Sequence, residues 1–173
     1  QDDHFIEGFN HAQLRRSGTM TERQKKKRSK LEAAHGRPEP QHTRDQVEKL
    51  LRRVTGGPCS IRLVSDEHRA YVQSVKRMKG WRVDHLRINS KAARTPRNPL
   101  WPVNLADLLV RHGGATHKRE KIAFSKRVQN ALLRMALFKV DRNFVQGVRV
   151  RDGKRSPSPA MKRGLATRRL TVE

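Results

Sequence analysis

Unbalanced positive charge is the feature that most limits what this chain can fold into. The 173 residues include 40 lysines and arginines but only 16 aspartates and glutamates, so the formal net charge is +24 at pH 7. Because like charges repel one another in a compact state, this excess predicts a polyanionic partner. Nucleic acid is the commonest such partner, since phosphates bound by cations release their condensed counterions.

The apolar content limits the core and the compartment. Hydrophobic residues make up 34% of the chain, below the roughly 45–50% of ordinary globular proteins. No run of about 18 apolar residues and no secretory signal is present, so no membrane partner is expected. The single cysteine, Cys59, excludes an internal disulfide and favours a reducing compartment, which we expect to be the bacterial cytoplasm or nucleoid. A first residue of Gln1 rather than Met favours a fragment or processed product.

Capping signatures predict a basic helical segment over residues 19–57. Thr21 with Gln24 reads as a capping box that opens a charged, solvated helix. Thr43 with Gln46 repeats the signature before an apolar stripe with helical spacing. The stripe comprises Val47, Leu50, Leu51 and Val54. Residues 5–14 are expected to form one strand.

The middle of the chain alternates strand and helix patterns. A β-branched run at 59–65, an amphipathic stretch at 67–79 and an alternating run at 81–88 predict a parallel βαβ unit over 59–88. We therefore expect an α/β (α+β) fold, with a mixed sheet and flanking helices.

The C-terminal half is expected to be helical, with basic connections. A basic loop at 89–101 precedes helices over 102–147, and the last of these is expected from about His117 to Val145. Residues 149–173 read as a basic, flexible tail, and Ser156–Pro159 reads as a mobile linker.

Two of the scarce acids are candidates for chemistry. Asp66 follows a strand of the βαβ unit, and ligands of α/β sheets bind at that end of a strand. The alternative is that Ser65 or Asp66 only caps the next helix. Glu120 stands among cations at the start of a helix, where an exposed ion pair is the alternative. His117 is a candidate to assist catalysis or to contact phosphate.

Carboxylates that are surrounded by lysines and arginines suit phosphoryl transfer on nucleic acid. Such reactions commonly use two Mg²⁺ ions about 3.5–4 Å apart, which need oxygen ligands. Surrounding cations hold the phosphate backbone in register. The candidate phosphate-binding residues are Arg15, Arg16, Lys25, Lys26, Lys27, Lys91, Arg94, Arg97, Lys118, Arg119, Lys126 and Arg127.

Several segments, in order, resemble insertion-element DDE transposases. Ser65–Tyr71, after its apolar strand, resembles the segment around the second aspartate of these enzymes, and Asn98–Asn104 with His117–Arg127 resembles their C-terminal half. Arg15–Thr21 and Thr171–Glu173 are similar to them as well. The ordered set, rather than any one segment, carries the resemblance, which covers most of the chain.

The resemblance implies an RNase H-like core over residues 1–148 whose three acids bind two Mg²⁺ ions for DNA strand cleavage and transfer. Asp66 would match the second acid and Glu120 the third, both as metal ligands. The implied partners are DNA, as element ends and target, and a second copy in a homodimeric transposition complex. The first acid and its strand are expected upstream of Gln1, which would leave this fragment inactive by itself. Asp141 also departs from the family, since an aromatic residue would suit that position better.

Two other classes of function compete with this interpretation. A non-catalytic basic module that binds DNA or RNA would need only the lysines and arginines, with Asp66 and Glu120 as a helix cap and a surface ion pair. A protein of anionic membranes is a weaker alternative, because the most basic stretch, Arg23–Lys30, lacks an aromatic or leucine-rich opposite face.

Overall fold

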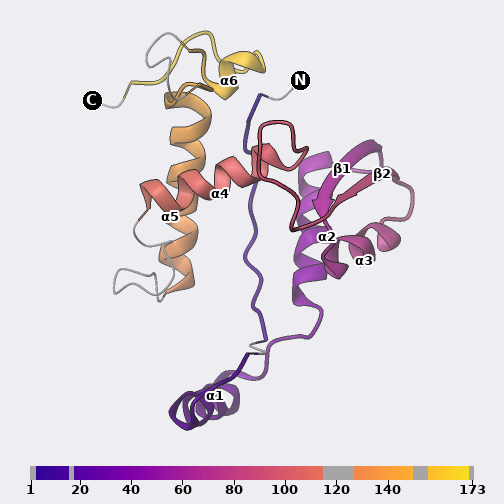
Figure 1. Cartoon of the computed structure of the whole chain (residues 1–173), viewed down its shortest axis with the longest axis vertical. Coiled ribbons are helices and arrows are strands. Elements are labelled where there is room, and N and C mark those ends of the chain that lie inside the picture. The colour runs from indigo at the N-terminus through magenta and orange to yellow at the C-terminus, as the bar shows by residue number, and fades with distance from the viewer. Residues whose placement is uncertain (1–2, 16–17, 115–126, 150–155, 172–173) are drawn as a thin grey trace. The chain divides into compact units, whose positions relative to one another are not determined.

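The structure, a computed structural model, describes residues 3–15, 18–114, 127–149 and 156–171. The chain divides into two units: one comprises Asn10–Ile61 and His68–Asp84, and the other comprises Gln1–Phe9, Arg62–Glu67 and His85–Glu173. Helices and one two-stranded parallel sheet make up the described elements (Figure 1). The fold class is therefore mixed α and β, as the sequence predicts.

Helix α1 (Glu22–His35) is held by its own cap rather than by a core. The predicted capping box is confirmed: the Thr21 hydroxyl accepts from the Gln24 N–H at 3.4 Å, and the Gln24 side chain accepts from the Thr21 N–H at 3.2 Å. No residue of α1 is buried. The helix ends at Gly36, whose φ of 77° lies in the region that favours glycine. Most cations of α1 therefore face solvent, although Arg28 is partly buried in an ion pair with Glu32.

Helix α2 (His42–Thr55) packs against helix α3 (Arg69–Arg77). Ser74, which is fully buried, places its hydroxyl 2.8 Å from the Arg44 carbonyl of α2 and 2.7 Å from the Ala70 carbonyl. Arg77 adds ion pairs to Asp45 and Glu48 at 2.9 and 3.1 Å. Partly exposed pairs of this kind contribute little stability, so the buried contact matters more.

The second predicted capping box, at Thr43, is wrong. The N-cap of α2 is Gln41, and no side chain caps this end. Because the helix begins at His42, Thr43 lies within the first turn and cannot occupy the cap position. Gly56 terminates α2 in the left-handed conformation, which agrees with the end of the helical segment predicted over residues 19–57.

Strands β1 (Ser60–Asp66) and β2 (Arg82–Ile88) flank α3 in the chain and form the parallel pair. This arrangement confirms the strand–helix–strand order expected over residues 59–88. Trp81 leads into β2, with its indole N–H 3.2 Å from the Thr55 hydroxyl and its ring 4.5 Å from the Arg52 guanidinium. The described part of the chain contains no further strand.

Within the described residues of the C-terminal half, there are three helices and one π-helical turn. They are α4 (Trp101–Gly113), α5 (Val128–Val140), the π-helix η2 (Asp141–Val145) and α6 (Pro159–Lys162). The start of the helix expected at His117 lies outside the described residues. The change to a π-helix at Asp141, with the Gln146 N–H bonded to the Asp141 carbonyl at 2.9 Å, is not visible in the sequence pattern.

Buried polar residues lie within η2 and just before α6 in the chain. Arg142 and Asn143 of η2 are buried, as are Ser156 and Ser158, so Ser156–Pro159 is not the mobile linker that its composition suggests. The Val148 N–H donates to the Pro157 carbonyl at 2.9 Å. Arg142 donates to the Gly147 carbonyl at 2.7 Å, and burial lowers the pKa of its guanidinium. Residues 156–160 are therefore packed, in contrast to the expected flexible tail, whereas most of residues 161–171 are exposed.

Residues 5–14 were expected as a strand but form none. The Asn143 side chain binds the backbone of this segment instead. It accepts from the Ile6 N–H at 2.9 Å and donates to the Ile6 carbonyl at 3.0 Å. Phe5 meets Phe144 edge to face at 6.3 Å between ring centroids. The Arg163 guanidinium lies 4.5 Å from the Phe5 centroid. The segment at residues 5–6 is therefore anchored by η2 and by Arg163.

Candidate functional site

Asp66 is the last residue of β1, at the carboxyl end of the parallel pair, and it is half-buried. The alternative that Ser65 or Asp66 caps α3 is wrong. The cap is His68, whose Nδ1 accepts from the Ala70 N–H at 3.3 Å. Asp66 therefore stands where ligands of α/β proteins bind, and it does not cap the helix.

Ser65, next to the end of β1, and His85, in the middle of β2, link the two strands beside Asp66. The Ser65 hydroxyl lies 2.8 Å from His85 Nε2 and 2.8 Å from the Asp66 carbonyl oxygen. Ser65 is only 5% exposed, so this pair is closed to a substrate and supports the strand end instead. Burial, with the nearby Arg87 as a second cause, lowers the pKa of His85 below its ordinary value, which favours the neutral imidazole.

The other predicted catalytic residues, Glu120 and His117, lie outside the described residues. The expected convergence of Asp66 and Glu120 therefore stays a prediction. Among the residues that the structure describes, no three His, Cys, Asp or Glu side chains form a group that could hold a metal. Asp66 offers the hard oxygen ligand that Mg²⁺ prefers, but one carboxylate fits only part of a two-ion site.

Three of the predicted phosphate-binding residues lie on one exposed helix. Lys25, Lys26 and Lys27 of α1 are exposed, and only Lys25 has an ion pair, to Glu22 at 2.7 Å, within the described chain. Arg15 is partly committed to the fold, since its Nε donates to the Pro38 carbonyl at 2.6 Å. Arg16 lies outside the described residues.

The predicted basic loop is ordered by asparagines and leaves its cations in solvent. Asn98 donates to the Ala93 carbonyl at 2.8 Å and accepts from the Leu100 N–H at 2.8 Å. Lys91, Arg94 and Arg97 are exposed, as is Arg127 at the N-cap of α5. Lys118, Arg119 and Lys126 lie outside the described residues.

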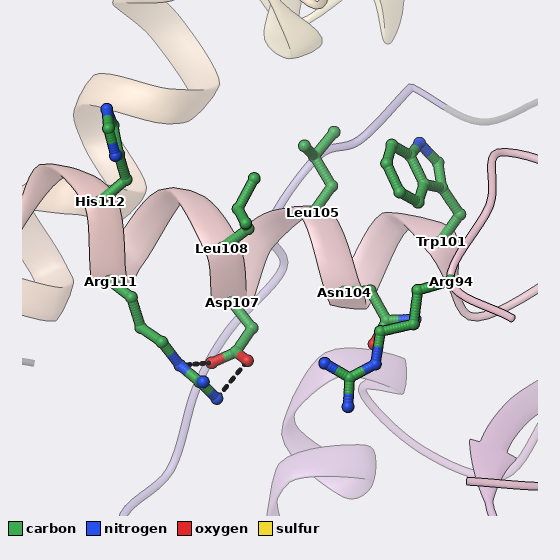
Figure 2. A pocket seen from close by; sticks show the side chains of 8 residues that line it. All are labelled: Arg94, Trp101, Asn104, Leu105, Asp107, Leu108, Arg111 and His112. Atoms are coloured by element: carbon green, nitrogen blue, oxygen red, sulfur yellow. Dashed lines mark hydrogen bonds and ion pairs between the residues drawn. The ribbon is translucent and has the colours of Figure 1, made fainter. Parts of the chain in front are cut away.

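A groove on α4 joins this loop, and Figure 2 shows the residues that line it. One side carries Trp101, Leu105, Leu108 and His112, and the other carries Arg94, Asn104, Asp107 and Arg111. The groove has a volume of about 390 Å³. Arg111 and Asp107 form an ion pair along its polar side. An aromatic and aliphatic row therefore runs along one side of α4, and a polar, cationic row runs along the other (Figure 2).

This groove was not predicted from the sequence, although the sequence contains its signal. Trp101, Leu105, Leu108 and His112 are spaced by four, three and four residues, which places them on one face of a helix. We assigned Trp101 to the loop and so did not count it with the later residues. A second hollow of about 490 Å³, lined by both apolar and polar residues of α4, α5 and the turn that follows α5, lies nearby along α4.

Comparisons with known protein families, curated proteins and solved structures give no match to this chain. Within the described residues, no helix is both long and apolar enough to span a membrane. The functional conclusion therefore depends on the residues and their arrangement.

Proposed function

We propose that this chain binds DNA and forms the C-terminal part of the catalytic domain of a DDE-type transposase. The observation that carries the proposal is the position of Asp66 as the last residue of β1 in a parallel strand–helix–strand unit. A carboxylate at that end of a strand is well placed to hold a metal ion against a ligand. An RNase H-like fold for this domain is part of the same proposal.

The proposed chemistry is phosphoryl transfer between DNA strands. Mg²⁺ would supply charge stabilisation for the attacking and leaving oxygens of the phosphodiester. Asp66 and Glu120 would hold the metal through carboxylate oxygens, which are the ligands that this hard ion takes. Exposed cations of the same chain would hold the phosphate backbone without reading bases.

Metal-directed backbone cleavage tests the role of Asp66 without requiring catalytic activity. Fe²⁺ occupies carboxylate sites that bind Mg²⁺, and with ascorbate and peroxide it cuts the polypeptide beside the bound ion. We expect a cut near the end of β1 that excess Mg²⁺ suppresses. Asp66→Asn and Glu120→Gln should each remove this cut.

The adjacent carboxylate provides a matched control. Glu67 is exposed and follows Asp66 directly, so Glu67→Gln removes the same charge one residue away. The cut should persist in Glu67→Gln. An equal cut in Asp66→Asn and the wild type, or no cut near β1 in the wild type, would contradict the metal role of Asp66.

A second candidate is a non-catalytic basic module that binds nucleic acid. The exposed lysines of α1, which has no buried residue, favour it. In this case DNA binding would be intact while metal-directed cleavage near β1 would be absent. The same experiment, combined with a DNA titration, therefore separates the two candidates.

A further inference from the structure

We propose that the α4 groove binds an unpaired base of single-stranded DNA, with Trp101 as the stacking surface. The inference deepens the proposed function, because it assumes that the chain binds DNA and adds which form of DNA this surface selects. It concerns a site distinct from Asp66 and from the lysines of α1.

The shape of the groove suits a flat ligand with a polar edge. Trp101, Leu105 and Leu108 form the apolar side, and Asn104 on the opposite side offers both an amide donor and a carbonyl acceptor (Figure 2). The volume of about 390 Å³ falls at the lower end of the roughly 300–1,000 Å³ of small-ligand pockets. A base that stacks on the indole would lie in the groove that this amide also lines.

The two tryptophans of the chain differ in what they contact. The Trp81 indole donates to Thr55 and lies against Arg52, so it is used by the fold. Trp101 is half-exposed, and among the described residues its indole N–H has no hydrogen-bond partner. Its ring therefore remains available to a ligand, whereas that of Trp81 does not.

The charges around the groove favour a nucleotide over an uncharged ligand. Asp107 is the only acid among the lining residues, and Arg111 pairs with it. Arg94 is exposed in the loop that also carries Lys91 and Arg97. Since each base of a strand is flanked by phosphates, cations beside a stacking surface complement the backbone on both sides of the bound base.

The geometry selects unpaired bases. In a duplex both faces of each base are covered by neighbouring pairs, so an indole reaches a face only where a base is unstacked. The groove should therefore raise affinity for single strands and leave duplex affinity unchanged.

The test uses the full chain with fluorescein-labelled oligo(dT) and a duplex of equal length, with binding measured by anisotropy. Trp101→Ala should weaken single-strand binding by about 5- to 150-fold, the range for one stacked base. It should change duplex binding by less than about twofold. Trp101→Phe should keep most of the single-strand affinity, because phenylalanine preserves an aromatic face.

Val103→Ala is the matched control, since Val103 is an exposed apolar residue of α4 that does not line the groove. It should leave both affinities unchanged. In Trp81→Phe, where Trp101 is the only tryptophan, oligo(dT) should quench the fluorescence. This measurement does not depend on the folding of Trp101→Ala.

Equal losses for single strand and duplex, or no loss in Trp101→Ala, would overturn the inference, as would unquenched Trp101 fluorescence. Unchanged single-strand affinity in Trp101→Ala would favour a protein partner as the ligand of the groove instead. If the wild type bound neither form of DNA, the proposed function itself would fail. The two failures are therefore distinguishable.

Discussion

Asn143 stabilises the fold through the backbone groups to which its side chain is hydrogen-bonded. Its side chain binds both the N–H and the carbonyl of Ile6, and Asn143 is fully buried. Asn143→Ala leaves both groups without these partners, so we expect a loss of about 1–3 kcal/mol in the free energy of unfolding. Urea titrations with an unchanged m-value measure it.

Asn89→Ala is the control for this prediction. Asn89 also accepts a backbone N–H, from Lys91 at 2.9 Å, but it is exposed. Its loss should cost about 0.5 kcal/mol or less. Equal effects of the two substitutions would show that the buried contact of Asn143 has no special weight.

His85 makes stability depend on pH in a defined direction. Because burial lowers its pKa in the folded protein below the ordinary 6.5, the unfolded chain takes up this proton first as the pH falls. The contribution of His85 is complete above about pH 7 and decreases from about pH 6.5 down to the folded-state pKa. The slope of this decrease is at most about 1.4 kcal/mol per pH unit.

Denaturant unfolding of the wild type and His85→Gln between pH 5 and 8 measures this effect. Glutamine has no proton to take up, so the wild type should lose stability relative to His85→Gln as the pH falls through this range. Parallel pH profiles for the two proteins would show that His85 titrates equally in the folded and unfolded states.

At the scale of the element, α1 should act as a phosphate-binding surface without affecting stability. Lys26→Ala with Lys27→Ala removes two exposed cations, neither of which has an ion pair among the described residues. Each lost phosphate contact should reduce the steepness of log K against log salt by about 0.9, so the pair should reduce it by about 1.8. The melting temperature should not fall, since alanine is a good helix former.

Lys49→Ala with Lys76→Ala is the matched control, because both lysines are exposed but lie on α2 and α3. This pair should leave the salt dependence nearly unchanged. An equal change in both double variants would mean that binding follows net charge alone and that α1 has no particular role.

The elements also show where sequence reasoning works and where it fails. The box at Thr21 was predicted correctly because all of its hydrogen bonds lie within four residues. The same signature at Thr43 failed because distant residues fix the start of α2: His42 Nδ1 accepts from the Gln13 N–H at 3.0 Å. Gln46, the expected box partner, contacts His42 at 2.9 Å instead. A local pattern cannot contain such contacts.

The burial of polar residues could likewise not be predicted from the sequence. Ser156–Pro159 has the composition of a linker, yet the Arg149 N–H donates to the Ser156 hydroxyl at 3.0 Å and three of the four residues are buried. Asp66 was located correctly because a short β-branched run ends there. The α4 groove was not, since it depends on where the helix begins.

For the whole molecule, the ion pairs of the described residues join acids mainly to arginines, while most of the described lysines are exposed. Most ion pairs of the described residues join a carboxylate to an arginine, as in Glu32 with Arg28, Asp45 with Arg77 and Asp107 with Arg111. The positive excess is therefore not neutralised within these pairs. A net charge of +24 then remains available to a polyanion.

If the excess charge serves to bind DNA, a titration of duplex DNA at several KCl concentrations will show it. If about six or more phosphates are contacted, log K should fall with log salt at a slope of about −5 or steeper, with tight binding at 50 mM KCl. A slope near zero, or no binding at that salt concentration, would contradict the account.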